Sequence, residues 1–376
     1  MPTQSQKTLF EKRQAQLFEI MQSAGLEALV LNPGYTLVYL TGLHFHLSER
    51  PVVVYFVPGT QPVVVYPELE KAKIKALPYP VQAFPYGEDP NTWEMVFRKA
   101  AEVAGIEEQQ VGVEPRAMRV LELHLLESSS PEASFISAEE SLAYLRMHKE
   151  ANEIAAMREA VSIAQRALQA TLGFIKAGTT EQQIASELTL QILKAGSEAS
   201  IPFAPIVASG PNSANPHAVP SDRKLQPGDL LIIDWGASFD GYISDLTRTF
   251  AIQHVEPEYE RIARIVASAN EAGRLAARPG VEAGEVDRIT RAVISLAGYG
   301  EYFTHRTGHG IGMEGHEAPY IYNQNKLPLA VGMTFTIEPG IYLPERGGVR
   351  IEDDMVVTED GAESLSDIPR ELVTLD

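Results

Sequence analysis

Five segments of the chain each carry one acidic or histidine side chain within or directly after an apolar or glycine-rich run. In DLLIIDWGASFDGYISDLTRTF, Asp234 ends an apolar run and Asp245 lies in a second strand-like stretch. His309 lies in a glycine-flanked loop, TGHGIG, Glu338 follows the apolar run TFTI, and Glu352 lies among apolar residues in GGVRIEDDMVV. An ionised carboxylate in an apolar interior is costly unless it is protonated, paired or bound to a metal. The four carboxylates therefore require a compensating charge.

Two divalent cations would supply that charge. Carboxylates that share a buried site raise one another's pKa and become protonated unless cations lie between them. Two divalent ions would neutralise four carboxylates and leave the histidine as a neutral ligand. Two metals about 3.5–4 Å apart with a bridging water are a known device for hydrolysis. The chain contains no cysteine, so thiolate ligands, disulfides and iron–sulfur clusters are excluded, and Mn, Co, Fe and Zn are the candidate metals.

Each of these five residues also has an ordinary structural interpretation. Asp234 and Asp245 fit turn or strand-edge aspartates, and Glu338 precedes Pro-Gly and fits the start of a turn. The acidic run that begins at Glu352 fits a solvated edge, and His309 fits a loop histidine without a ligand. The metal-site hypothesis therefore depends on the five residues occurring together and in one order.

The order of these residues closely resembles that of the pita-bread metallopeptidases. The matching contexts are IIDWG, YISDLTRTF, TGHGIG, TIEPG and RIEDD, which fall within residues 150–365. The family includes Xaa-Pro dipeptidase (prolidase), aminopeptidase P, methionine aminopeptidase and creatinase. Creatinase lacks this set of ligands, so the complete set favours a metal-dependent hydrolase. The alternatives are a hydrolase of the creatinase type and a non-catalytic binding protein on the same fold.

The resemblance implies a role for each of the five residues. Asp234 would chelate one metal ion, and His309 and Glu338 would chelate the other. Asp245 and Glu352 would bridge the two ions. Glu338 would also accept a proton from the attacking water and pass it to the leaving nitrogen.

Further positions match residues of the substrate pocket in this family. His217 in GPNSANPHAVP and His305 match pocket histidines, and His316 matches a histidine that stabilises the tetrahedral intermediate. Tyr342 and Arg350 match groups behind the ligands, and Arg350 is expected to hold the Asp234 carboxylate in place as well as to contribute to substrate binding.

The resemblance implies small peptides with proline at the second position as substrates. Because the proline nitrogen of the scissile bond has no N–H, its site needs an apolar platform, for which Phe203, Tyr320 and Tyr322 are candidates. The spacing between Glu338 and Glu352 is similar to that of prolidase-like members. An Xaa-Pro dipeptidase is therefore slightly favoured, with aminopeptidase P as the alternative.

One position departs from the dipeptidase pattern. Some prolidases carry an arginine directly after the proline of a stretch like HEAPY, where this chain has Tyr320. A dipeptidase needs a cation for the free carboxylate of its substrate, and Arg50, Arg306 and Arg346 are the candidates to replace that arginine.

The elements that position these residues are expected to form two domains, 1–145 and 146–376. In the first, helices are predicted at 4–24, 68–76, 90–104 and 117–127, and strands at 27–31, 51–67 (a hairpin), 80–85, 110–113 and 132–137. This alternation predicts a mixed α/β domain. The resemblance identifies it as the smaller N-terminal domain of prolidase and creatinase.

The second domain is expected to be the pita-bread catalytic domain. A long helical stretch is predicted to break near His148, and a helix with Thr180 as N-cap is predicted to close on Gly196. Strands and glycine turns follow, with helices near 257–277 and 284–298, so that two helix-then-strand blocks suggest a degenerate duplication. The overall class is α/β (α+β).

Composition limits the partners. The net charge of −19 argues against nucleic acid and anionic membranes, and no run of about 18 apolar residues is present. The N-terminus lacks the apolar core of a signal peptide, which makes the cytoplasm the expected compartment. The resemblance implies a homodimer, in which His44 and His46 are either surface histidines or contacts to a neighbouring active site.

Overall fold

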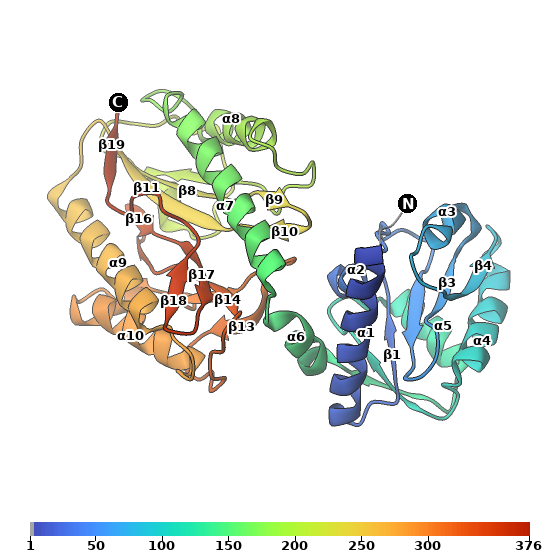
Figure 1. The fold of residues 1–376 in the computed structure, drawn as a ribbon. Coiled ribbons are helices and arrows are strands. Elements are labelled where there is room, and N and C mark those ends of the chain that lie inside the picture. Colours follow the sequence, from blue (N-terminus) through green and yellow to red (C-terminus); the bar gives the residue numbers. More distant parts are fainter. Residues whose placement is uncertain (1–3) are drawn as a thin grey trace. The chain divides into compact units, whose positions relative to one another are not determined.

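The computed structural model describes residues 4–376, which divide into two compact units (Figure 1). One unit ends at Arg146 and the other begins at Met147. Each is a mixed arrangement of helices and sheets, which confirms the predicted α/β (α+β) class. None of the described helices combines the length and the apolar character needed to cross a membrane.

The N-terminal unit is built on a six-stranded sheet with the strand order β4-β3-β2-β1-β5-β6. Its strands are β1 (Ala28–Leu31), β2 (Val53–Phe56), β3 (Val63–Pro67), β4 (Gln82–Tyr86), β5 (Gln110–Val113) and β6 (Ser134–Ser137). Its helices are α1 (Gln4–Ala24), α2 (Tyr35–Thr41), α3 (Lys71–Lys75), α4 (Trp93–Ala104), α5 (Val120–Ser129) and α6 (Glu139–Met147), with short 3-10 turns η1 (Glu68–Glu70) and η2 (Pro90–Thr92).

The sequence explains the core of this unit. The valine-rich strands β2 and β3 form the predicted antiparallel hairpin, because β-branched side chains fit a sheet that is buried on both faces. Helix α4 covers the sheet with Phe97, Ala100 and Ala101, all of which are fully buried. Helix α2 has no counterpart in the sequence-based prediction, because its seven residues are too short to show a helical period.

The C-terminal unit contains two blocks, each a pair of helices followed by strands. The first block consists of α7 (Ala151–Leu172), α8 (Glu181–Lys194), β7 (Ile206–Ser209), η3 (Gly210–Ala214), β8 (Leu230–Trp235), β9 (Ser238–Phe239), β10 (Tyr242–Ile243) and β11 (Leu246–Ile252). The second consists of α9 (Pro257–Ala276), α10 (Ala283–Leu296), η4 (Gly300–Tyr302), β12 (Gly308–Gly310), β13 (Glu317–Ile321), β14 (Thr334–Ile337), β15 (Gly340–Leu343), β16 (Gly347–Arg350), β17 (Asp353–Val357), β18 (Ala362–Ser364) and β19 (Val373–Leu375).

Each block forms its own sheet. The first has the order β19-β11-β8-β7, so that the last strand of the chain joins the sheet of the first block. The second has the order β13-β12-β14-β17-β18, and β15 and β16 form a separate two-stranded ribbon. The helices α7 and α8 pack on the strands of the first block and α9 and α10 on those of the second. An isolated bridge between Thr247 and Glu352 connects the two blocks directly.

Local interactions set the helix boundaries in this unit. Helix α8 begins with a capping box in which the Thr180 hydroxyl and the Gln183 side chain exchange hydrogen bonds with the backbone, as the N-cap prediction required. The break before α7 occurs because His148 bridges to Met333 and the Lys149 N–H donates to the Gly332 carbonyl. His148 and Lys149 therefore pair with backbone of the second block and do not continue the helix.

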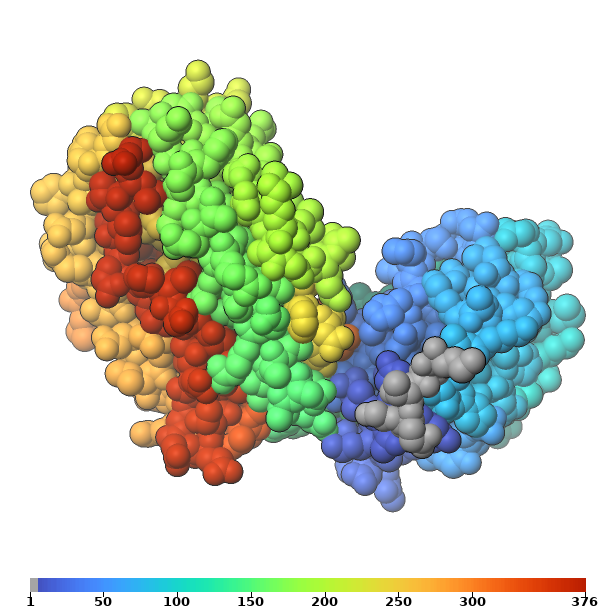
Figure 2. Space-filling model, turned by 45° about the horizontal axis from the view of Figure 1, so that its top comes forward, coloured from blue at the N-terminus to red at the C-terminus, as the bar shows by residue number. Residues whose placement is uncertain are grey.

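Helix α7 also contacts the end of the chain. In Figure 2 it crosses the visible face of the C-terminal unit beside the C-terminal segment, drawn in red. The Arg158 guanidinium is 2.8 Å from the Glu363 carboxylate, and the Gln165 amide donates to Asp367 over 2.8 Å. The Trp235 side chain is fully buried, and its indole N–H donates to the Ala164 carbonyl of α7.

Candidate active site

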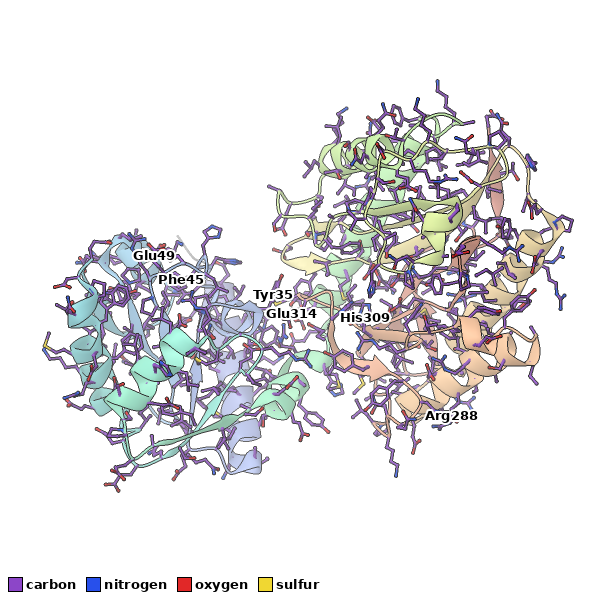
Figure 3. All side chains as sticks on the ribbon, turned by 180° about the vertical axis from the view of Figure 1, so that it is seen from behind. Tyr35, Phe45, Glu49, Arg288, His309 and Glu314 are labelled. Atoms are coloured by element: carbon purple, nitrogen blue, oxygen red, sulfur yellow. The ribbon has the colours of Figure 1, made fainter. Side chains whose placement is uncertain are left out.

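The five acidic and histidine residues of the sequence analysis come together in the C-terminal unit. Asp234 lies in β8, and Asp245 lies between β10 and β11. His309 is the middle residue of β12 (Figure 3), Glu338 directly follows β14, and Glu352 lies between β16 and β17. The first block thus contributes two aspartates, and the second contributes the histidine and both glutamates.

Three of the local predictions for these residues are wrong in detail. His309 was expected in a loop but lies in a three-residue strand. Asp245 and Glu352 were expected inside strands, but both lie in the short gaps where the ladder is interrupted. Asp245 and Glu352 thus come from two such interruptions, one in each block.

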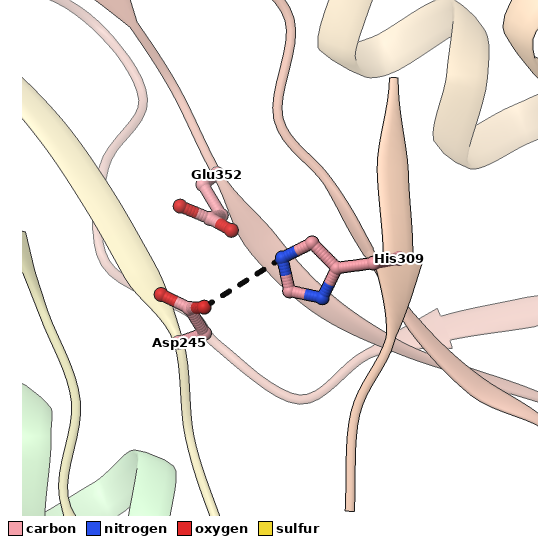
Figure 4. Close-up of side chains that lie close together, drawn as sticks. All are labelled: Asp245, His309 and Glu352. Atoms are coloured by element: carbon pink, nitrogen blue, oxygen red, sulfur yellow. Dashed lines mark ion pairs between the residues drawn. The ribbon is translucent and has the colours of Figure 1, made fainter. Parts of the chain in front are cut away.

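His309 lies at the centre of the cluster. Its Nε2 atom is 3.4 Å from Glu338 Oε1 and 3.8 Å from Asp245 Oδ2. Ligand atoms of Asp245, His309 and Glu352 all lie within 4.8 Å of one another, and all three residues are buried (Figure 4). The Nδ1 atom is 3.2 Å from the Gly310 carbonyl. A proton on Nδ1 would use that contact and leave the Nε2 lone pair directed at the carboxylates.

The glycines beside His309 allow neighbouring strands to approach it closely. A Cβ atom at Gly308 would lie 1.8 Å from the Thr336 carbonyl oxygen of β14, and one at Gly310 would lie 2.3 Å from Ala318 of β13. Side chains at these two positions would push both strands away from the histidine. The GHG sequence therefore supplies the histidine and also lets β13 and β14 pack closely around it.

Arg350 compensates one of the four carboxylates. Its Nη2 atom donates to Asp234 Oδ2 over 2.6 Å, as the resemblance implied, and both side chains are buried. The same guanidinium donates to the Tyr342 hydroxyl over 3.1 Å, to the Pro216 carbonyl over 3.3 Å and, through Nε, to the Thr247 hydroxyl over 3.1 Å. Its geometry is thus fixed by four partners on different segments.

Hydrogen bonds between the two blocks also hold the Glu352 carboxylate and the backbone of Asp245. The Thr247 hydroxyl donates to Glu352 Oε2 over 2.6 Å, and the Glu352 N–H donates to the Thr247 carbonyl. The Asp245 N–H donates to Asp354 Oδ2 over 3.0 Å. The side chains that bring the blocks together are therefore the side chains that orient the cluster.

Burial shifts the pKa values in the direction expected for a site without enough positive charge. Burial raises the pKa of Glu338 to about 8, against the opposing effect of Arg350. Burial, and then the neighbouring Glu352 and Asp234 carboxylates, raise the pKa of Asp245 well above its usual range. Burial and the nearby His316 lower the pKa of His309, so its imidazole is neutral. The protein by itself thus does not neutralise the cluster.

These residues fit divalent metal ions. Arg350 is the one arginine that forms an ion pair with the four carboxylates among residues 4–376. The Asp234 Oδ1 atom is buried and has no hydrogen-bond partner in the described part of the chain. Buried carboxylate oxygens and a neutral imidazole are the donors that Mn, Fe, Co and Zn accept.

The three further histidines lie around this cluster. The His305 Nε2 atom is 2.8 Å from the Tyr342 hydroxyl, and its Nδ1 atom is 4.0 Å from Glu338 Oε2. The exposed His316 ring is centred 4.0 Å from the ring of His309. His217 is exposed in the loop after η3, directly after Pro216, whose carbonyl Arg350 holds. Burial raises the pKa of Asp234, and the ion pair with Arg350 opposes that effect.

Both parts of the chain are similar to known protein families. Residues 155–359 match the model of metallopeptidase family M24, and residues 13–148 match the creatinase/prolidase N-terminal domain. The first match spans more than half of the chain.

The chain belongs to metallopeptidase family M24.

This M24 chain is similar over nearly its whole length to known dipeptidases and prolidases. It is 34% identical to the Xaa-Pro dipeptidase of Lactobacillus delbrueckii subsp. lactis, over 94% of this chain and 96% of the relative. The crystal structure of dipeptidase PepE from Mycobacterium ulcerans superposes with a TM-score of 0.91 at 38% identity, covering 98% of both chains. That of a prolidase from Thermococcus sibiricus gives 0.92 at 32% identity, covering 97% of this chain and 99% of the other. The predicted pita-bread domain with a creatinase/prolidase-like N-terminal domain is thus confirmed.

Two residues of this M24 site were not identified from the sequence. Thr247 bonds both Arg350 and Glu352, and Asp354 anchors the backbone of Asp245. In YISDLTRTF, Thr247 is two positions after Asp245. Residues at this spacing lie on the same face of a strand, so alternation could have indicated that Thr247 faces the cluster. Asp354 had no comparable signal, because its partner is 109 residues away in the sequence.

Proposed function

We propose that this M24 metallopeptidase is a dinuclear metal-dependent Xaa-Pro dipeptidase that hydrolyses the bond between an N-terminal residue and proline. The observation that carries the proposal is the buried cluster of Asp245, His309 and Glu352, with Glu338 3.4 Å from the histidine. Relatives along the whole chain include an Xaa-Pro dipeptidase and a prolidase. The catalytic domain is residues 146–376, and residues 1–145 form the N-terminal domain.

We assign the metal ligands as the sequence analysis predicted. Asp234 would hold one ion, His309 and Glu338 would hold the other, and Asp245 and Glu352 would contribute to both. The raised pKa values of Asp245, Glu338 and Glu352 in the metal-free protein support this assignment, because a divalent cation is the counter-charge that these buried carboxylates lack. Mn is the metal we expect first, and Co, Zn and Fe suit the same donors.

The metals would supply an activated water at neutral pH and polarise the scissile carbonyl. Side chains of the protein would then transfer the proton of the water and stabilise the negative charge that develops on the carbonyl oxygen. Glu338 accepts the proton of the attacking water and returns it to the proline nitrogen that leaves. His316, exposed beside His309, donates to the oxygen that becomes negative. His305 and His217 flank the cluster from the Tyr342 and Pro216 sides and line the substrate site.

The proline ring is expected to rest on aromatic side chains at the edge of the site. Phe203 and Tyr320 are half-buried, and Tyr322 is 42% exposed. Tyr320 is the candidate we favour, because it lies in β13, the strand paired with the strand of His309. Small Xaa-Pro peptides are therefore the proposed partners. A homodimer and a cytoplasmic location are further expectations, and His44 and His46 are exposed in the N-terminal unit.

The test is metal rescue on two substrates. The protein is stripped with a chelator, Mn or Co is added back, and hydrolysis of Ala-Pro and Ala-Pro-Ala is measured in parallel. Recovery mainly on the dipeptide supports the proposal, and recovery mainly on the tripeptide would instead identify an aminopeptidase P. The variant His309→Ala should not recover, whereas Glu363→Gln, a change of an exposed carboxylate, should recover fully. An absence of metal-dependent hydrolysis of either peptide contradicts the proposal and favours a binding protein on this fold.

A further inference from the structure

An Xaa-Pro dipeptide carries a carboxylate on the proline itself. The site that receives it contains four carboxylates, of which Asp234 alone has an arginine partner among the described residues. An incoming anion therefore needs a cation at the edge of the site, and a guanidinium is suited to that role because it binds a carboxylate through two parallel N–H groups.

Two of the three arginines considered from the sequence are already paired elsewhere. The Arg50 guanidinium lies in the N-terminal unit, 2.8 Å from Glu88 and 2.6 Å from Glu49. Arg346 lies at the surface, where it is 2.6 Å from Glu258. Their donors are satisfied by carboxylates of the protein.

Arg306 differs from both. It is three residues before His309, and its guanidinium carbon lies 4.6 Å above the centre of the Tyr320 ring. The Arg306 side chain forms no ion pair with a carboxylate of residues 4–376, and it is half-buried. Tyr320 lies in β13, which pairs with the strand of His309, so the Arg306 guanidinium over this ring lies at that edge of the cluster.

Taking the dipeptidase activity proposed above as its basis, we propose that Arg306 binds the C-terminal carboxylate of the substrate and so makes the enzyme specific for dipeptides. The Tyr320 ring orients the guanidinium from one face, as cation–π contacts do. The N–H groups of the Arg306 guanidinium, which form no ion pair with a carboxylate among the described residues, are available to the substrate carboxylate. Arg306 thus replaces the arginine that some prolidases carry at the position of Tyr320, and the two residues act together.

A purely structural role for Arg306 makes a different prediction. If it only packed on Tyr320, or only lowered the pKa of Glu338, its removal would impair hydrolysis of every substrate alike. A role in carboxylate binding affects only substrates that have this carboxylate. The comparison therefore requires two substrates that differ in that group alone, and Ala-Pro and Ala-Pro-NH₂ share the free amine, the scissile bond and the proline ring.

The experiment measures kcat and KM of the Mn-loaded enzyme on both substrates. Arg306→Met keeps much of the length of the side chain and removes its charge, and Arg306→Lys keeps the charge without the planar fork. In the Met variant we expect kcat/KM for Ala-Pro to fall roughly 10- to 100-fold, chiefly through KM, the range of a lost charge-assisted hydrogen bond. The value for Ala-Pro-NH₂ should stay within about threefold, and the Lys variant should lie between. Arg346→Met is the matched control and should change neither.

The outcomes separate the two proposals. Equal losses on Ala-Pro and Ala-Pro-NH₂, or a wild-type enzyme that cleaves the two equally well, overturn the role of Arg306 and leave the peptidase activity intact. A selective loss in Arg346→Met overturns it in favour of that residue. Failure of the wild-type enzyme to cleave either substrate with metal overturns the proposed function and this inference with it. Activity of Arg306→Met on Ala-Pro-NH₂ shows at the same time that the variant is folded.

Discussion

Replacement of Arg350 by methionine should destabilise the metal-free C-terminal unit strongly. The guanidinium donates to Asp234, Thr247, Tyr342 and Pro216, and it is 3% exposed. Removing it leaves the buried Asp234 carboxylate with no counter-charge, and Asp234 Oδ1 already lacks a hydrogen-bond partner among the described residues. Loss of one partner of a buried ion pair costs about 3–5 kcal/mol. For a unit of this size, such a loss corresponds to a decrease in Tm of roughly 6–20 °C.

The assay must follow the C-terminal unit alone, because unfolding of two domains is not a two-state process. The chain has two tryptophans, Trp93 in the N-terminal unit and the buried Trp235 in the other. In a Trp93→Phe background, fluorescence during urea unfolding therefore reports on the C-terminal unit. Arg346→Met is the control: its ion pair with Glu258 is exposed, and its loss should cost less than about 1 kcal/mol.

Metal supplies the second half of this test. If divalent ions bind the cluster, they give Asp234 the counter-charge that Arg350→Met removes, so saturating Mn should reduce the difference between variant and wild type. An equal loss of stability with and without metal would contradict our assignment of Asp234 as a ligand. A loss below about 1 kcal/mol in the metal-free protein would contradict the view that Arg350 is the counter-charge of this carboxylate.

Two further changes test the acidic groups. Burial raises the pKa of Glu338 to about 8, so the folded metal-free protein binds a proton that the unfolded chain releases near pH 4.5. The stability from this proton is complete below that pH and is lost as pH rises through about 8, and urea midpoints in chelator from pH 5 to 9 should fall accordingly; a flat profile contradicts the shift. The buried Glu181 carboxylate accepts from the backbone and hydroxyl groups of both Ser209 and Ser221, at the two ends of the His217 loop. Glu181→Gln, which replaces one acceptor oxygen by an NH₂ donor, should cost about 1–3 kcal/mol and raise KM, whereas an unchanged KM would show that the loop is positioned otherwise.

Local signals in the sequence predicted much of the fold. The hairpin of β2 and β3 follows from two valine runs around a Pro-Gly turn, and the start of α8 follows from Thr180 and Gln183. The alternation of side chains along a strand places neighbouring Glu352 and Asp353 on opposite faces. The Asp353 carboxylate binds Arg248 and Arg370, which bring its pKa down to about 2 against the effect of burial, on the side away from the cluster.

What the sequence could not predict depends on contacts between distant segments. Glu352 was expected within a strand, but it leaves the regular ladder because its partner is Thr247, 105 residues away. His309 was expected in a loop, since glycines on both sides are typical of loops. Here the glycines instead permit β14 and β13 to close on the histidine from both sides. Local propensity depends on the residue type alone. Strand boundaries and register also depend on the partner strand, which local sequence does not show.

The candidate centre and the junction of the two helix–strand blocks are the same structure. The first block provides Asp234 and Asp245, and the second holds them through Arg350 and Asp354. In return, Thr247 of the first block holds Glu352 of the second. A charge placed at this junction acts on both blocks at once, because Asp234 and Glu352 each accept from a donor of the opposite block and the Asp245 N–H donates to Asp354 across the same junction. The buried repulsion among these carboxylates therefore opposes the docking of the blocks in the metal-free protein, and a counter-charge at the junction favours catalysis and docking together.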